Sequence, residues 1–139
     1  MIREVVFSIL VLLFAPAMAM ADKYTGTMTT NVDHLDSPSY TLQSNIFAGV
    51  KKGAVLNFRF YGNYLKLSSK GYYRTLFKQR ANRFSYEYSG TYNNCAERYI
   101  TRVVRITSTK LSWYNSAEVS CADGGYLNLY QRMVMTLKK

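Results

Sequence analysis

The stretch from Val55 to Ser69, VLNFRFYGNYLKLSS, decides the fold class of this 139-residue chain. Its first half alternates apolar with mostly polar residues, and this period of two predicts a strand with one buried face. Gly62-Asn63 follows as a two-residue turn, for which type I′ or II′ geometry is expected. The second half repeats the alternation with leucine. The stretch therefore predicts a β-hairpin whose two strands share an apolar face.

The same pattern continues on both sides of this hairpin. Residues 72–79 and 83–92 add two more strands after short turns, so four sequential strands form a meander. Residues 32–39 are predicted to form a polar loop, and so are residues 93–97. A short helix across residues 40–50 is a rival to the strand expected there. The remaining predicted strands cover residues 24–31, 40–47, 98–107, 111–114, 118–121 and 126–137.

Eight or nine short strands with short connections predict an all-β protein. The favoured architecture is a small antiparallel up-and-down barrel or a strongly curved sheet of about eight strands. Closure would remove the exposed strand edges. A β-sandwich is the rival, although the short interval between the two cysteines argues against an immunoglobulin domain. The predicted core consists of Leu56, Phe58, Phe60, Leu65, Phe84, Leu127 and Leu129.

Residues 1–21 have the layout of a secretory signal peptide. Met1-Ile2-Arg3 is a short basic start, and an apolar run leads to a small-residue stretch with overlapping Ala-x-Ala patterns. The apolar run is too short to span a bilayer, which takes about 20 residues. We therefore expect cleavage after Ala19 or Ala21 and export to the periplasm or the cell exterior. Residues 22–139 are expected to form one β domain, and an uncleaved membrane anchor is the alternative.

Cys95 and Cys121 are the two cysteines of the chain and lie 26 positions apart. In an exported protein an even cysteine count indicates a disulfide, and here one pairing exists. In the chain-entropy model such a bridge contributes about 3–4 kcal/mol to stability. Two buried free thiols are the alternative. No Cys-x-x-Cys pair is present and the chain has a single histidine, so no metal site is expected.

Positive charge is concentrated in the meander. The chain has a formal net charge of +10, and nine Lys or Arg residues but no Asp or Glu lie between Ser37 and Tyr86. Basic groups interleaved with tyrosines suit an anionic glycan, a lipid headgroup or an acidic protein, and nucleic acid is a less favoured partner. The alternative is that tyrosine suits strands and that Lys and Arg protect the sheet surface. The predicted binding face consists of Arg59, Tyr61, Tyr64, Lys66, Tyr72, Arg74 and Lys78.

Arg102 is a second kind of candidate, because it shares a strand face with Ile100, Val104 and Ile106. If that face is interior, the arginine would anchor an anionic ligand or complete a structural bond. A β-bulge would instead turn it outward. Arg102 is therefore a candidate interior anchor with an outward alternative.

The sequence offers no catalytic constellation. His34 lies between Asp33 and Asp36, an arrangement that could serve a general base, but a solvated loop histidine is the better interpretation. No Gly-x-Ser-x-Gly motif is present, and no glycine-rich phosphate loop precedes a helix. We therefore expect a protein that is not an enzyme and needs no cofactor.

The closing part of the chain contains two runs with a characteristic pattern, ITSTKLSW over residues 106–113 and LNLYQRM over residues 127–133. The first is similar to a hairpin of the lipocalin-like small barrels of exported bacterial proteins, in which a polar turn leads through Lys-Leu into a strand. The second resembles their last strand, which often ends with a basic residue. The resemblance covers roughly the last 40 residues, implies a small barrel and assigns no binding residue.

Three functions fit these features. The first is an exported, non-catalytic binding protein that uses the basic, Tyr-rich sheet face for an anionic partner. The second is an inhibitor or immunity protein that blocks an exported enzyme, whose acidic cleft a basic face would complement. The third is a barrel that binds a small apolar ligand internally. Sensitivity to salt separates the first function from the third, and a stoichiometric protein partner identifies the second.

Overall fold

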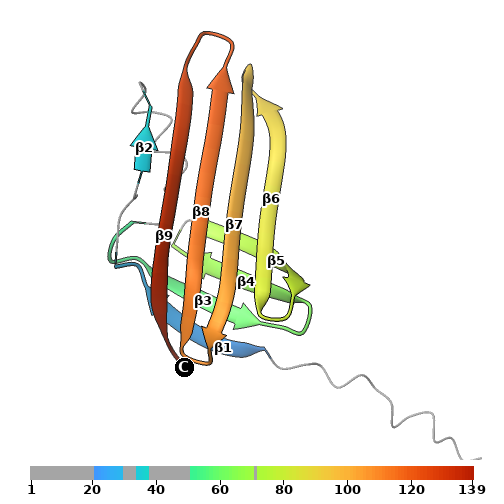
Figure 1. Ribbon diagram of the computed structural model, residues 1–139, viewed down its shortest axis with the longest axis vertical. Helices are drawn as coiled ribbons and strands as arrows, with labels where there is room; N and C mark the ends of the chain where they lie inside the picture. Colours follow the sequence, from blue (N-terminus) through green and yellow to red (C-terminus); the bar gives the residue numbers. More distant parts are fainter. Residues whose placement is uncertain (1–20, 30–33, 38–50, 71) are drawn as a thin grey trace, which may run out of the picture.

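The computed structural model describes residues 21–29, 34–37, 51–70 and 72–139 (Figure 1). Residues 1–20 of the predicted signal peptide and the predicted strand at 40–47, with its helical rival, lie outside the described residues. The described elements are all strands: β1 Asp22–Thr27, β2 His34–Asp36, β3 Val55–Phe60, β4 Tyr64–Ser69, β5 Tyr72–Arg80, β6 Arg83–Tyr92, β7 Cys95–Thr107, β8 Lys110–Cys121 and β9 Tyr126–Lys138.

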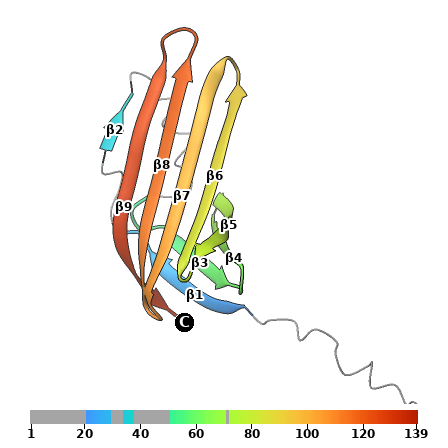
Figure 2. The ribbon, with the colours of Figure 1, turned by 45° about the vertical axis from the view of Figure 1, so that its right-hand side comes forward.

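Eight of these strands form a closed antiparallel barrel, which confirms the predicted fold class. Each strand from β3 to β9 pairs with the next along the chain, and β1 pairs with both β3 and β9 to close the ring. The closing seam is short, with Thr25 opposite Lys138 and Gly26 opposite Leu137. A side chain at position 26 would overlap that of Met135, so glycine lets β1 approach β9 closely. The ninth strand, β2, lies along the other part of β9 (Figure 2).

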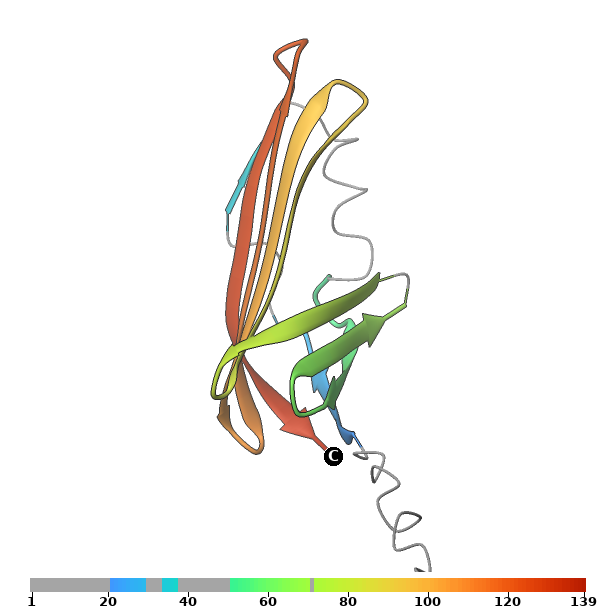
Figure 3. The same ribbon diagram turned by 90° about the vertical axis from the view of Figure 1, so that its right-hand side faces the viewer.

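The strands differ in length, and this shapes the molecule. β3 and β4 have 6 residues each, whereas β7 and β9 have 13. The long strands β6 to β9 therefore extend well beyond the short ones, and β5 runs from the long strands across to β4 (Figure 3). The outer face of the barrel is continuous through β5 because β4, β5 and β6 remain hydrogen-bonded neighbours.

The alternating residues identified in the sequence form the core, as predicted. Each strand points one set of side chains inward, and all seven predicted core residues are buried. Phe58 is 0% exposed and its ring centroid lies 6.3 Å from that of Phe60. The interior is further filled by Trp113 from β8, which is also completely buried. This packing is the main source of stability, because each fully buried large apolar side chain contributes about 1.5–3 kcal/mol.

The β3–β4 turn differs from the prediction. Neither Gly62 nor Asn63 has the positive φ that a type I′ turn requires at both positions and a type II′ turn at the first. The loop is instead held by the backbone N–H of Tyr61, which donates to the carbonyl of Tyr64 at 2.9 Å. The predicted position of the turn is therefore confirmed, whereas the predicted type I′ or II′ backbone geometry is wrong.

Positive φ angles occur instead in the β6–β7 turn, at Asn93 (48°) and Asn94 (60°). Tyr92 and Cys95 pair across this two-residue turn, which matches type I′ geometry. Asparagine adopts the left-handed region more readily than other residues with a side chain. Cys95 therefore begins β7, whereas the sequence had predicted a loop over residues 93–97.

β8 is one continuous strand, although two separate strands, over residues 111–114 and 118–121, were predicted. The interruption is avoided because the buried Asn115 side chain is satisfied: its Oδ1 accepts a hydrogen bond from Thr101 Oγ1 at 2.9 Å. Toward the neighbouring strand β9, Trp113 Nε1 donates a hydrogen bond to Gln131 Oε1 at 3.3 Å. Buried polar side chains with partners of this kind can remain inside a strand.

The two cysteines form the predicted disulfide, with an S–S distance of 2.00 Å. Cys95 and Cys121 are direct cross-strand partners at the end of the β7–β8 pair. A disulfide is typical of proteins in a non-reducing, exported compartment. Within the described residues, no helical segment is long and apolar enough to cross a membrane.

Candidate binding surface

Three cations form a row on the outer face of the barrel. Arg59 of β3 lies directly between Lys23 of β1 and Lys66 of β4 in the strand register. All three side chains point away from the core, since their chain neighbours Tyr24, Phe58 and Leu67 are buried. We call these three residues the basic row.

Two tyrosines lie beside the basic row, at the β3–β4 turn. The rings of Tyr61 and Tyr64 stack with centroids 4.3 Å apart. Lys66 Nζ is 5.9 Å from both ring centroids, within the range of a cation–π contact. The structure therefore brings together four of the seven residues of the predicted binding face, Arg59, Tyr61, Tyr64 and Lys66, and adds Lys23, which the sequence did not indicate.

No carboxylate neutralises the basic row within the described residues. The ion pair found among the described residues lies elsewhere: Arg98 Nη2 on β7 is 2.9 Å from Glu87 Oε1 on β6. The hydrogen bond to Glu87 raises the pKa of Arg98. Like charges directly opposite one another destabilise a sheet. The basic row is therefore a feature that the fold itself does not require.

Tyr72 and Arg74, which were predicted on the outer face, point into the barrel. Arg74 lies opposite the fully buried Leu67 in the β4–β5 register, which assigns it to the inner face. Its guanidinium carbon lies 5.0 Å from the ring centroid of Tyr72 and 4.9 Å from that of Tyr86. These two residues therefore do not belong to the outer binding face.

The surroundings of Tyr72 and Arg74 are polar but incompletely bonded. Burial raises the pKa of Tyr72. The Tyr72 hydroxyl lies near Thr101, but neither this hydroxyl nor Arg74 Nε makes a hydrogen bond of standard geometry. Thr101 donates instead to Asn115. Burial and the nearby Glu97 carboxylate raise the pKa of Tyr99 to about 12. Tyr72 and Tyr99 are therefore neutral phenols at physiological pH.

Lys78 is exposed at the end of the barrel rather than on the basic row. It lines a depression there together with Asp22, Asn82 and Arg105. The carboxylate of Asp22 offsets part of this positive charge. We therefore leave Lys78 out of the candidate binding surface.

Arg102 lies on the outer face, so the interior placement considered from the sequence is wrong. Its neighbours Thr101 and Val103 are buried, and strand alternation turns Arg102 to solvent without a bulge. Its guanidinium carbon is 5.6 Å from the ring of Tyr114, and that of Arg132 is 5.2 Å from the same ring.

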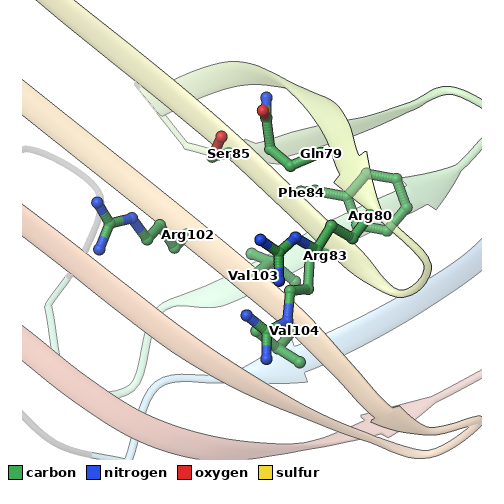
Figure 4. Close-up of a pocket in the computed structure, with 8 residues that line it drawn as sticks. All are labelled: Gln79, Arg80, Arg83, Phe84, Ser85, Arg102, Val103 and Val104. Atoms are coloured by element: carbon green, nitrogen blue, oxygen red, sulfur yellow. The ribbon is translucent and has the colours of Figure 1, made fainter.

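A pocket with three arginines lies on this outer face at the β5–β6 turn (Figure 4). Arg80 and Arg83 are direct cross-strand partners, and Arg102 comes from the adjacent strand β7. Ser85 and Gln79 contribute a hydroxyl and an amide to the lining, and the volume is about 400 Å³. We call this site the arginine pocket. The sequence signalled it only through the absence of acidic residues around Arg80 and Arg83.

His34 belongs to the short strand β2 rather than to the predicted polar loop. Its ring stacks on Tyr130 of β9 with centroids 5.1 Å apart, while Asp36 accepts a hydrogen bond from the Tyr126 hydroxyl at 3.2 Å. Three exposed residues cannot show the alternation that reveals longer strands. Across the described ranges, no group of three or more His, Cys, Asp or Glu side chains could hold a metal ion.

No protein-family model, curated protein or solved structure matches this sequence. The eight-stranded antiparallel barrel is compatible with the small lipocalin-like barrels that the sequence resembles. The chemistry of the binding surface therefore has to be inferred from the residues of this chain.

Proposed function

We propose that this chain is an exported, non-catalytic binding protein that holds an anionic partner on the outer face of its barrel. The observation that carries the proposal is the basic row, three cations on neighbouring strands with no carboxylate to neutralise them among the described residues. An anionic partner would supply the missing counter-charge. The stacked pair Tyr61 and Tyr64 would add an apolar surface next to it.

Two features of the interior weigh against an internal apolar ligand. Phe58, Leu67 and Trp113 lie in the interior of the barrel, and each is completely buried. The inner face of the long strands carries the polar side chains of Thr101, Asn115 and Gln131. An inhibitor or immunity protein would use the same basic surface against an acidic protein, and a stoichiometric complex with such a protein would reveal it.

Reversal of the charges in the basic row is expected to weaken binding. The triple variant K23E/R59E/K66E should bind a sulfated oligosaccharide about 10-fold to 100-fold more weakly at low salt, because three exposed attractions become repulsions. Titration calorimetry would measure the dissociation constants. The fold should survive, since the three side chains lie outside the core.

The matched control is K51E/K70E/K110E, which changes the net charge by the same amount at exposed lysines outside the basic row. It should weaken binding much less than the first variant. Equal losses in the two variants would show that net charge matters and the row does not. Wild-type protein that binds neither the oligosaccharide nor anionic lipid vesicles at low salt would contradict the proposed function.

A further inference from the structure

We propose that the arginine pocket binds a sulfate or phosphate group carried by an anionic glycan. This inference rests on the proposed function and specifies it, because the pocket and the basic row both lie on the outer surface of the barrel. In the strand register the outer residues Tyr64, Phe77, Ser85 and Arg102 follow one another across β4, β5, β6 and β7. Arg102 is thus three strand steps from Tyr64, or about 14 Å along the surface.

The positive charge of the pocket is uncompensated by any residue that lines it. Arg80 and Arg83 lie directly opposite each other, which is unfavourable for two like charges. No acidic side chain lines the pocket, and the ion pair found in the described residues lies elsewhere, between Arg98 and Glu87. A bound anion would turn this local repulsion into attraction.

The hydrogen-bond donors of the pocket suit a tetrahedral anion. The guanidiniums of Arg80 and Arg83 lie near each other, and each presents a planar fork of N–H groups that matches the oxygens of a phosphate or sulfate group (Figure 4). Arg102 lines the pocket, with its guanidinium turned toward Tyr114. Ser85 and Gln79 add further donors at the edge of the pocket (Figure 4). A tetrahedral group on an ester linkage offers three free oxygens to these donors, whereas a carboxylate offers two. The pocket is therefore better matched to sulfate or phosphate than to carboxylate.

The curvature of the barrel bears on which molecule carries the sulfate or phosphate group. Tyr64 and Arg102 are separated by three of the eight steps around the closed barrel, so they face different directions and a flat membrane could not contact both. A flexible polymer could follow the curved surface between them. The aromatic ring in the pocket, Phe84, is only 6% exposed, so the pocket itself offers no face on which a nucleobase could stack. Phe77, between Tyr64 and Ser85 in the strand register, is 60% exposed and offers an apolar face to a sugar ring or a base. The curved surface therefore favours a flexible polyanion over a membrane, and the lack of a stacking face in the pocket favours a glycan over a nucleic acid.

The test compares arginine with lysine at the pocket, because lysine keeps the charge and loses the planar fork. The variant R80K/R83K would be titrated with a sulfated oligosaccharide, a carboxylate-only oligosaccharide of equal charge and a single-stranded DNA of equal charge. The matched control is R98K, an exposed arginine outside the pocket. Circular dichroism would verify that each variant is folded, and both replaced pocket residues are exposed.

Wild-type protein should bind the sulfated oligosaccharide most tightly of the three probes. R80K/R83K should lose about tenfold in affinity for it, as expected for the loss of a charge-assisted hydrogen bond. Its affinity for the carboxylate probe should stay near the wild-type value, and R98K should leave both unchanged. Unchanged binding of the sulfated probe by R80K/R83K, or equal losses for both glycans, would overturn the inference, as would tighter binding of DNA.

Failure of this inference can be distinguished from failure of the proposed function. If only the pocket assignment is wrong, R80K/R83K behaves like wild type while K23E/R59E/K66E still loses affinity. If the wild-type protein binds none of the polyanions or anionic vesicles, the proposed function fails and the pocket inference fails with it.

Discussion

Replacement of Phe58 by alanine is expected to lower the free energy of unfolding by about 3–5 kcal/mol. The Phe58 side chain is 0% exposed and lies in the middle of β3, between the buried residues Leu56 and Phe60. Its removal takes away apolar burial and leaves a cavity that the surrounding strands can fill only in part. Urea unfolding, followed by circular dichroism, would measure the change as a shift of the midpoint.

The matched control for this variant is Asn57→Ala, because Asn57 is the exposed neighbour on the same strand. Its effect should stay within about 0.5 kcal/mol, as is usual for surface positions. A loss below about 1 kcal/mol for Phe58→Ala would show that the inner and outer faces of β3 have been assigned the wrong way round.

Loss of the disulfide is expected to lower stability by about 3–4 kcal/mol in the double variant C95A/C121A. The bridge closes a loop of 26 positions and joins direct partners on β7 and β8. Without it the unfolded chain gains conformational freedom, while the folded strands keep their other ladder contacts. Urea unfolding of the variant and of the oxidised wild type gives the difference.

Reduced wild-type protein is the control for the disulfide, since it lacks the bridge but keeps both cysteine side chains. It should unfold at nearly the same urea concentration as C95A/C121A. Equal stability of oxidised and reduced wild type would contradict the expected contribution. Two alkylatable thiols in natively exported protein would contradict the bridge itself.

The strands and the core could be predicted from sequence because residues 55–69 alternate cleanly between apolar and polar. A buried face imposes this period, and one shift in register would expose every leucine and phenylalanine. The inward orientation of Leu56, Phe58 and Leu65 therefore followed directly from the pattern and is confirmed.

The orientation of β5 could not be predicted in the same way. Its sequence places aromatic or apolar residues on both faces, with Tyr72 and Leu76 inside and Tyr73 and Phe77 outside. This pattern fits either orientation. Arg74 was assigned to the basic, Tyr-rich face without a strand pattern to support it, and that placement is wrong. Pairing with β4 decides the matter, since it places Arg74 opposite Leu67.

The remaining site residues depended on contacts between distant parts of the chain. Lys23 lies far from the meander in sequence and joins the basic row only because β1 closes the barrel against β3. Arg102 reaches the arginine pocket through the β6–β7 register, which places it opposite Ser85. Composition predicted a basic surface, and the closure of the barrel decides which cations share it.

The salt dependence of binding tests the central claim most directly. Wild-type protein and K23E/R59E/K66E would be titrated with the sulfated oligosaccharide at ionic strengths of about 0.01 M and about 0.15 M, where the Debye lengths are about 30 Å and about 8 Å. Wild-type affinity should fall by at least about tenfold between the two conditions, and the variant should lose most of this dependence. Wild-type affinity that is the same at both ionic strengths, or a variant that follows the wild type, would contradict binding through the basic row.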